Sequence, residues 1–471
     1  MSAGMADAAY CFGTVLAVQL NARLPGRRLL VLHTAVFVIA SVLTAAATAP
    51  AVYFTGRILQ GLTTSLMLLT AAPALVLGWP VARMRVTAMV MNMGIFGAVA
   101  IGPVIGGAFD GLGDWRLLFW LSAVVGAVAL LLAVLTFTDL PPQDRALKFD
   151  AASLALASVG CVAAFFGASR LVDHSVTAPT VLVPMLLGVL CLLGLIVHQT
   201  FVRDPLMPIR QLASTIPLAA IVLALFGGGV SVSLVGLLQL SSEAGGLSPA
   251  LFWPEFIGAV VTAFLFGRLF FTAYVPVLAF AGMLCLTATA LVVATAGSSA
   301  AIVAVCTAGI GLGVGASVAP GLFVAGFALP SLQLPRIFAL VELLRGVAAF
   351  LTAPLIVHLA RTTGDDLTAG IRNAALACFV LVVVGVLLVA AIAVSGGLRL
   401  QAPRIVAWQN GPDAALDSPP LGAALRQRPG RRPRRQGPGR EMDGQAGGAT
   451  HPPRQYRSDQ DDLPDRGRLR R

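Results

Sequence analysis

The stretch that decides the fold is residues 86–108, VTAMVMNMGIFGAVAIGPVIGGA, which contains no charged side chain. A helix needs about 20 apolar residues to cross a hydrocarbon core of about 30 Å, so this stretch is long enough to span a membrane. Small residues recur in it every four positions and therefore share one face of the helix; they are Gly94, Ala98, Gly102 and Gly106. Small side chains let membrane helices approach closely, so we expect a packed seam along this face.

The rest of the chain has the same apolar character. Its 471 residues are 57% hydrophobic and 11% charged, with a mean hydropathy of +0.87, whereas soluble domains carry about 25% charged residues. This composition excludes a water-soluble globular protein. Thirteen membrane spans are predicted, near residues 6–24, 29–48, 52–77, 86–108, 115–137, 151–170, 178–199, 215–240, 249–268, 274–296, 300–325, 335–358 and 371–396.

Short connections between these spans predict an all-α polytopic membrane protein. Two connections are longer and more polar than the others: residues 138–150, which contain DLPPQDRALKFD, and residues 200–214, which contain two prolines and two arginines. They divide the chain into parts. We expect an N-terminal half at 1–137, a hinge with two central spans and a surface segment at 138–214, and a C-terminal half at 215–396.

The remaining residues, 397–471, differ in composition from the body. They are rich in Pro, Gly and Arg and include RQRPGRRPRRQGPGR. A segment of this kind buries too little apolar area to fold, so we expect a disordered basic tail. Beside the inner leaflet its arginines would attract anionic lipid, and we expect no nucleic-acid partner.

The distribution of arginines predicts the orientation in the membrane. Cytoplasmic loops carry an excess of Lys and Arg. One set of alternate loops holds eleven basic residues: Arg23, Arg27, Arg28, Arg83, Arg85, Arg145, Lys148, Arg203, Arg210, Arg268 and Arg336. The opposite set holds Arg116, Arg170, Arg361 and Arg372. The first set is therefore predicted to be cytoplasmic, with the C-terminus inside and, because thirteen is odd, the N-terminus outside.

Ionisable side chains within spans are costly and are functional candidates by default. Arg57 and Gln60 lie about one turn apart on one face, where they could bind substrate, relay protons or cap carbonyls of a neighbouring helix. Glu342 lies about 9 Å deeper in the membrane than Arg336 by helix rise, and Arg345 follows it at i+3. This pair could be a static ion pair, or it could open and carry protons.

Two further acids are weaker candidates. Glu255 lies near the outer start of its helix, where the helix dipole favours a carboxylate. Asp7 lies at the external edge of the first span and could be either functional or simply solvated. Metal-ligand spacings, nucleophile–base pairs and phosphate-binding loops are not recognised in the sequence. We therefore expect neither an enzyme nor a cofactor.

Several motifs together resemble the major facilitator superfamily, specifically its fourteen-span drug:proton antiporter family. The segment GRILQGLTTS is similar to that family's Arg-x-x-Gln-Gly motif, at Arg57, Gln60 and Gly61. The segment GAVAIGPVIGG is similar to its antiporter motif Gly-Pro-x-x-Gly-Gly, with Ala98 where the first Gly of the motif stands. The matching residues are Gly102, Pro103, Gly106 and Gly107. The similarity runs over nearly all of residues 7–396.

The chain departs from this family in two places. The first helix of the family, which carries an acidic motif, has no counterpart, and we favour a misplaced start over true loss of that helix. The cytoplasmic loop motif QLNARLPGRR keeps Gly26, Arg27 and Arg28 but has Asn21, Ala22 and Arg23 where the family has an acid. A charge relay at the inward face is therefore expected to be weakened.

The resemblance implies a function as well as a fold. Two helical halves would rock around a central cavity, and the antiporter motif would seal the outer face. The chain would be a secondary exporter of drug-like molecules, driven by proton antiport, in a bacterial inner membrane. Its partners would be substrate, protons and lipid; a periplasmic adaptor and an outer-membrane channel are left open. The alternative is a non-transporting, degenerate or truncated homologue that acts as a membrane partner or scaffold.

Overall fold

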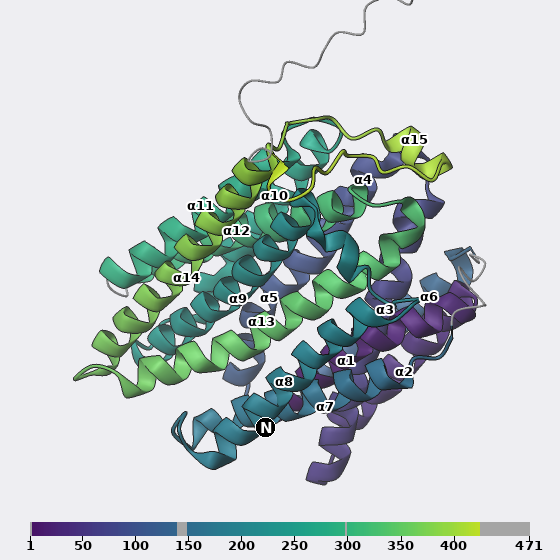
Figure 1. Cartoon of the computed structure of the whole chain (residues 1–471). Coiled ribbons are helices and arrows are strands. Elements are labelled where there is room, and N and C mark those ends of the chain that lie inside the picture. The colour runs from purple at the N-terminus through teal and green to yellow at the C-terminus, as the bar shows by residue number, and fades with distance from the viewer. Residues whose placement is uncertain (1, 139–147, 297–298, 424–471) are drawn as a thin grey trace, which may run out of the picture. The chain divides into compact units, whose positions relative to one another are not determined.

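The computed structural model describes residues 2–138, 148–296 and 299–423, and these residues are almost entirely helical (Figure 1). The N-terminal half contains α1 (Ser2–Arg23), α2 (Gly26–Ala45), α3 (Pro50–Gly78), α4 (Met84–Asn92), α5 (Ala98–Gly111) and α6 (Arg116–Thr136). Two central helices follow, α7 (Ala151–Ser169) and α8 (Pro179–Phe201). The C-terminal half contains α9 (Thr215–Ala244), α10 (Trp253–Leu269), α11 (Val275–Thr295), α12 (Ala300–Phe327), α13 (Leu334–Thr362) and α14 (Leu367–Gly396).

Twelve helical segments of the described chain are long and apolar enough to cross a membrane, so the all-α polytopic fold is confirmed. The predicted count of thirteen differs at the first element. The expected span 6–24 is present as α1, but this helix is not among the twelve. Asp7, Gln19 and Asn21 lower its apolar content. Packing against α3, α7 and α13 holds α1 in place, and Cys11 on it is fully buried.

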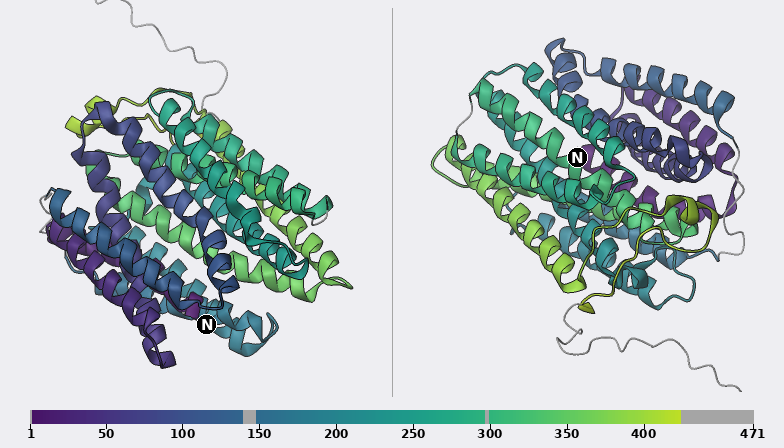
Figure 2. Two further views of the ribbon diagram at one scale, coloured as in Figure 1. Left: turned by 180° about the vertical axis from the view of Figure 1, so that it is seen from behind. Right: turned by 90° about the horizontal axis from the view of Figure 1, so that it is seen from above.

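Helix contacts divide the body into two groups that meet along two lines. In the first group α3 packs against α1 and α2, and α2 packs against α6. In the second group α9 packs against α12, α13 and α14, and α12 also packs against α10 and α11. The groups meet where α1 contacts α13 and where α4 and α5 contact α10 (Figure 2). In the α7–α8 hairpin, α7 lies against α1 and α13, and α8 packs on α7. This arrangement brings residues from both halves together at the α1–α13 contact.

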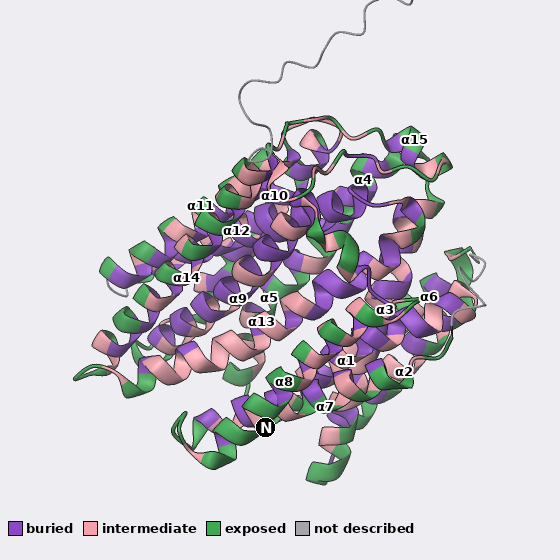
Figure 3. Cartoon of the chain, viewed as in Figure 1, coloured by how far each residue is buried: buried purple, intermediate pink, exposed green. Residues whose placement is uncertain are grey.

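Burial shows which helices form the interior. Within an apolar stretch of 18 residues, 72% of the residues of α9 and 61% of those of α12 are buried, against 22% in each of α6, α8 and α14 (Figure 3). Exposed Leu and Val side chains cover the outer helices. Because lipid tails accept such side chains, this pattern is typical of a helical bundle surrounded by membrane.

Local sequence explains where individual helices begin and end. The carboxylate of Asp366 accepts a hydrogen bond from the Ala369 N–H at 2.7 Å and so caps the start of α14. The same helix ends at Gly397, whose φ of +64° is a left-handed conformation that glycine adopts without strain. The C-terminal half of the bundle therefore ends where the polar segment was expected to begin.

The predicted span 86–108 is a single long helical segment, Val81–Gly111, with an interruption. Residues Met93–Gly97 form a π-helical turn between α4 and α5. Such turns are rare and often lie at functional sites. This one immediately precedes the Gly-Pro-x-x-Gly-Gly motif, and the sequence did not predict it.

The expectation of disorder from residue 397 is wrong for residues 398–423, which we call the C-terminal strap. The strap contains α15 (Ile405–Asn410), whose Trp408 is fully buried. Ile405, Trp408 and Leu416 supply apolar area that the Pro-, Gly- and Arg-rich part of the tail lacks. Residues 424–471 lie outside the described residues.

Candidate functional site

The ion pair predicted within α13 is present. Nη2 of Arg345 lies 2.6 Å from Oε2 of Glu342, and Nε of Arg345 donates to the same oxygen at 3.0 Å. Glu342 is only 2% exposed. Charged side chains are stable at such depth when they are paired and hydrogen-bonded, so the two residues satisfy each other within one helix.

Tyr10 completes this pair from the opposite half. The Tyr10 hydroxyl donates to Oε2 of Glu342 at 3.1 Å and accepts a hydrogen bond from Nη2 of Arg345 at 3.3 Å. Tyr10 lies on α1, whereas the other two residues lie on α13. We call Tyr10, Glu342 and Arg345 the α1–α13 network. The sequence analysis missed Tyr10; its place one turn after Asp7, on the same helix face, was the available signal.

Two glycines make room for this network. A Cβ added at Gly228 on α9 would lie 2.7 Å from Cγ of Arg345. A Cβ added at Gly346 would lie 2.8 Å from Sγ of Cys11 on α1. Real Cβ atoms do not approach other atoms so closely, so glycine at both positions lets α9, α13 and α1 come together around the charged pair.

A cavity of about 300 Å³ lies directly beside the network. Its lining includes six polar residues, Asp7, Tyr10, Arg57, Gln60, Thr64 and Ser122, and the phenyl rings of Phe37, Phe119 and Phe350. The cavity therefore brings together three candidates predicted from the sequence and the one that was missed. Tyr10 is shared, because it lines the cavity and also bonds to Glu342.

The contacts of Arg57 place it on the cavity wall. Its Nη1 donates to Oε1 of Gln60 at 3.0 Å, and Gln60 in turn donates to Oγ of Ser41 at 2.9 Å. The Arg57 guanidinium also lies 5.4 Å from the centroid of the Phe119 ring, a favourable cation–π distance. Arg57 and Gln60 thus share one face, as predicted. With Asp7 on the same wall, the cavity presents one basic and one acidic side chain.

Glu255 does not line this cavity. It lies in the first turn of α10, as expected, but it is only 2% exposed, and its Oε2 has no hydrogen-bond partner. The backbone at Glu255 packs tightly on Gly311 of α12. The structure therefore separates Glu255 from Asp7, Arg57 and Glu342.

The antiporter motif lines a second cavity, of about 550 Å³, between the two halves. Its lining includes Gly102, Pro103, Gly106 and Gly107, together with Asp110, Glu243 and the connection from α9 to α10. The expected stripe of contacts at every fourth residue is not what closes this seam, because an added Cβ at Gly94, Gly102 or Gly106 would meet no atom within 4 Å.

The close approaches lie elsewhere on the same segment. A Cβ at Gly107 would overlap Pro249, in the connection that precedes α10, and one at Gly97 would lie 3.2 Å from the Phe256 ring. Both partners belong to the C-terminal half. The π-helical turn that ends at Gly97 shifts the register of the residues that follow it. The four-residue spacing in the sequence therefore predicted close helix contacts at glycines that do not make them.

The cytoplasmic loop motif lies at the start of α2. Gly26 begins that helix, and Nη2 of Arg27 donates to the Val134 carbonyl at the end of α6 at 2.6 Å. Arg28 is exposed. Asn21 is one of the residues found where the related family has an acid. Its side chain donates to the Leu69 carbonyl at 3.1 Å and so joins α1 to α3.

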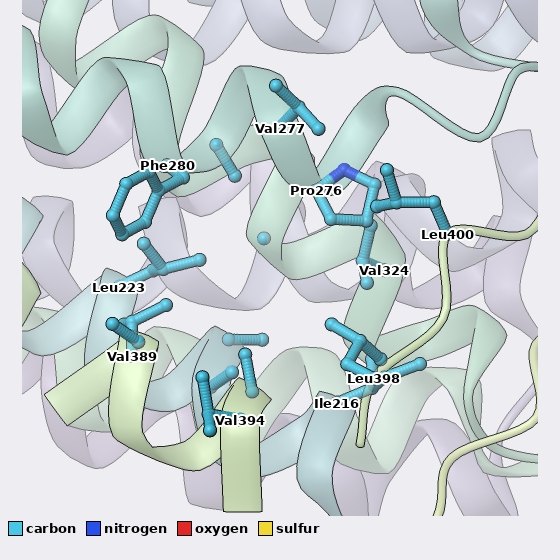
Figure 4. Close-up of a pocket in the computed structure, with 16 residues that line it drawn as sticks. Ile216, Leu223, Pro276, Val277, Phe280, Val324, Val389, Val394, Leu398 and Leu400 are labelled. Atoms are coloured by element: carbon cyan, nitrogen blue, oxygen red, sulfur yellow. The ribbon is translucent and has the colours of Figure 1, made fainter. Parts of the chain in front are cut away.

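A third cavity, of about 310 Å³, lies among α9, α11, α12 and α14 (Figure 4). Its walls are aliphatic and aromatic, with Leu223, Phe280 and Val389 among them, and Leu398 and Leu400 of the C-terminal strap close one end. It holds no ionisable side chain. This cavity offers apolar contact only, so the first cavity remains the candidate functional site.

Comparison with known proteins agrees with this architecture. The profile of the Major Facilitator Superfamily matches residues 1–238, half of the chain. The methylenomycin A resistance protein of Bacillus subtilis (strain 168) is 26% identical over 258 residues, which cover 53% of each chain. The lincomycin resistance protein LmrB of the same organism is 27% identical over 169 residues, or 35% of each chain.

The curated relatives match over only part of their length. The chain covers 38%, 23% and 53% of three of them, or about a quarter to a half. Among solved structures, the human organic anion transporter MFSD10 (TETRAN) superposes with a TM-score of 0.57 at 14% identity, covering 82% of this chain and 83% of the other. At that identity the likeness concerns the fold alone.

Proposed function

Because this chain belongs to the Major Facilitator Superfamily, we propose that it exports small drug-like organic molecules in exchange for protons. The names of two relatives, resistance proteins for methylenomycin A and for lincomycin, support this substrate class. The observation that carries the proposal is the α1–α13 network, in which Tyr10 joins a buried ion pair to the cavity beside it. A transporter moves its substrate without changing it chemically, so no residue is given a catalytic role.

Glu342 is the proposed proton carrier. Protonation of Glu342 would remove the negative charge that compensates Arg345. An uncompensated buried charge is costly, so the guanidinium would have to gain water or another partner. The hydrogen bond from Tyr10 would weaken at the same time, because a neutral carboxyl accepts less strongly than a carboxylate. Proton binding would thus loosen the contact between α1 and α13, which is the contact that rocking of the halves must change.

The first cavity is the proposed substrate site. Its volume of about 300 Å³ is at the lower end of the range for small-molecule pockets. Aromatic walls suit an apolar ring system, while Asp7 and Arg57 offer an acidic and a basic side chain to polar groups of the substrate. A molecule bound there would contact Tyr10 directly. Substrate and proton would therefore act on the same hydrogen-bonded network from two sides.

Transport into inverted membrane vesicles tests the proposal. Vesicles containing the chain are energised with an acidic lumen, and uptake of ethidium, a fluorescent organic cation, is recorded together with lumenal pH. We expect uptake to accompany proton release and to stop when the gradient is collapsed. Ethidium, lincomycin and methylenomycin A are each tried. If none of them enters faster than in vesicles lacking the chain, the scaffold alternative is favoured.

A further inference from the structure

We propose that the C-terminal strap, residues 398–423, is a latch that holds together the predicted cytoplasmic ends of the two halves and must release before the protein opens to that side. This inference rests on the proposed transport function, because only a transporter needs those ends to separate. Figure 1 shows the strap and α15 running across one end of the bundle, close to α4 and far from the N-terminus.

The strap is anchored to the C-terminal half by Trp408. This side chain is fully buried, and its Nε1 donates to the Leu329 carbonyl at 2.7 Å. The indole ring packs edge-on against Phe327 at a centroid distance of 5.1 Å. The Leu416 N–H donates to the Phe327 carbonyl at 2.9 Å. These contacts fix α15 against the end of α12.

The last part of the strap caps a second helix of the same half. The carbonyl of Pro419 accepts hydrogen bonds from the N–H of Thr215 at 3.0 Å and from its hydroxyl at 2.8 Å. The hydroxyl of Ser418 accepts from the Ile216 N–H at 3.0 Å. The first N–H groups of a helix have no partner within the helix, so the strap satisfies groups that α9 leaves open. Both anchors lie in the C-terminal half.

Gln409, the residue after the buried Trp408, reaches the other half. Its Nε2 lies 2.9 Å from the Trp79 carbonyl, 3.1 Å from that of Leu77 and 3.4 Å from that of Val76. These carbonyls belong to the last turn of α3 and the residue that follows it, where helical carbonyls lack intrahelical partners. One amide therefore joins a segment fixed to the C-terminal half to a helix end of the N-terminal half.

This geometry has the properties of a releasable latch. If the halves rock apart at this end, the anchored strap moves with α9 and α12, and Gln409 leaves the carbonyls of α3. Those carbonyls are at the end of a helix and can bond to water instead. A neutral hydrogen bond exchanged for water shifts an equilibrium by about fivefold. The latch therefore biases the protein toward closure at this end without locking it.

Cysteine labelling tests the latch without requiring transport. Ala88 is fully buried on α4, a helix that packs against α10 of the other half, so Ala88→Cys, in a background whose six native cysteines are alanine, reports separation of the halves. Inverted vesicles are treated with a water-soluble maleimide, and the labelling rate is measured. We expect Gln409→Ala to raise the rate about fivefold.

Asn410→Ala is the matched control. Asn410 is the next residue of α15, and its side chain donates only to the Val406 carbonyl within the same helix, at 3.1 Å. This variant removes an amide without touching α3, so its labelling rate should equal that of the parent. Equal rates in parent and Gln409→Ala, at equal melting temperature, would overturn the latch. So would an equal increase in both variants.

A reversible lock tests the coupling to transport. Trp79→Cys and Gln409→Cys are combined in the same background and joined by a short thiol cross-linker that a reductant cleaves. We expect ethidium uptake to stop on cross-linking and to return on reduction. Full uptake by cross-linked protein would contradict the latch. If the unlinked parent moves none of the three compounds, ethidium, lincomycin and methylenomycin A, the proposed function fails, while the labelling comparison still decides whether the strap holds the halves together.

Discussion

At the scale of single residues, variants of the α1–α13 network can distinguish a structural role for Glu342 from a role in proton coupling. Glu342→Gln leaves the Arg345 guanidinium buried without a counter-charge, which should lower the free energy of unfolding by about 3 kcal/mol. Replacing both residues with glutamine should restore that stability. If Glu342 carries the proton, gradient-driven ethidium uptake stays absent in the double variant, measured per folded protein. Recovery of uptake together with stability would reduce the pair to a structural one.

Tyr10 provides a second prediction at this scale. Tyr10→Phe removes the hydroxyl that bonds to Glu342 and Arg345 but keeps the ring, which packs edge-on against Phe350. We expect a loss of about 1 kcal/mol in stability and a fall in gradient-driven uptake of about fivefold. Tyr53→Phe is the control, since that ring packs on Trp115 and Phe119 but does not itself line the cavity. Unchanged uptake in Tyr10→Phe would remove this residue from the coupling pathway.

These residues also show what the sequence could predict. The pair Glu342–Arg345 was predictable because three residues along a helix is a local spacing. Tyr10 bonds to Glu342 across 332 residues of sequence, and nothing in a single sequence states that α1 and α13 touch. The positions of Arg57 and Gln60 relative to each other were predictable for the same local reason, whereas their shared cavity with Asp7 was not.

At the scale of elements, two adjacent glycines of α5 have different surroundings, so we expect substitutions at them to have different effects. Gly107→Leu would force a side chain into Pro249, whereas Gly106→Leu would extend into a cavity of about 550 Å³. Overpacking of this kind costs about 1–3 kcal/mol. We therefore expect ethidium uptake to be lost in Gly107→Leu and retained in Gly106→Leu, at equal amounts of inserted protein. The reverse order would show that the motif packs through the other glycine.

The α7–α8 hairpin provides a prediction about pH. Asp150 caps α7, and although burial alone would raise its pKa, hydrogen bonds from Ser153 and His198 outweigh that effect and hold the pKa below its usual range. A depressed pKa contributes stability that is present above the unfolded-state value and is lost as pH falls through the folded-state value. Acid should therefore loosen the start of α7.

Asp150→Asn tests this effect. Asparagine is also a good N-cap but does not titrate, so the variant should lose less stability than the parent between about pH 5 and pH 3. Thermal melting across this range, in parent and variant, is the measurement. Asp150→Ala should instead cost about 1 kcal/mol at neutral pH through loss of the cap. Identical acid profiles in parent and Asp150→Asn would contradict the assigned cause.

Some elements of the fold could be predicted from the sequence and others could not. Long apolar runs marked twelve spans, because crossing a membrane imposes a length and a composition. The C-terminal strap escaped prediction because the average composition of residues 397–471 concealed Ile405, Trp408 and Leu416. The π-helical turn escaped because a single inserted residue leaves no compositional mark.

At the scale of the whole molecule, orientation links the arginine distribution to the C-terminal strap. The strap contacts the end of α3, the start of α9 and the end of α12. At this same end of the bundle, Arg83 lies in the connection from α3 to α4, and Arg85 and Arg336 lie in the first turns of α4 and α13. An excess of basic residues in loops and at the adjoining helix ends favours the cytoplasm. The strap should therefore lie inside the cell, where a basic tail would meet anionic lipid.

Reporter fusions test this orientation. Gly246 lies in the turn after α9, at the opposite end of that helix from the strap, and it is exposed and therefore suited to insertion. We expect a phosphatase inserted at Gly246 to be active, because it folds only outside, and a fluorescent protein at the C-terminus to be bright, because it folds only inside. Exchanging the two reporters should silence both. Activity of the phosphatase at the C-terminus would invert the orientation, and the maleimide that reports release of the latch would then have to be applied from the other face of the membrane.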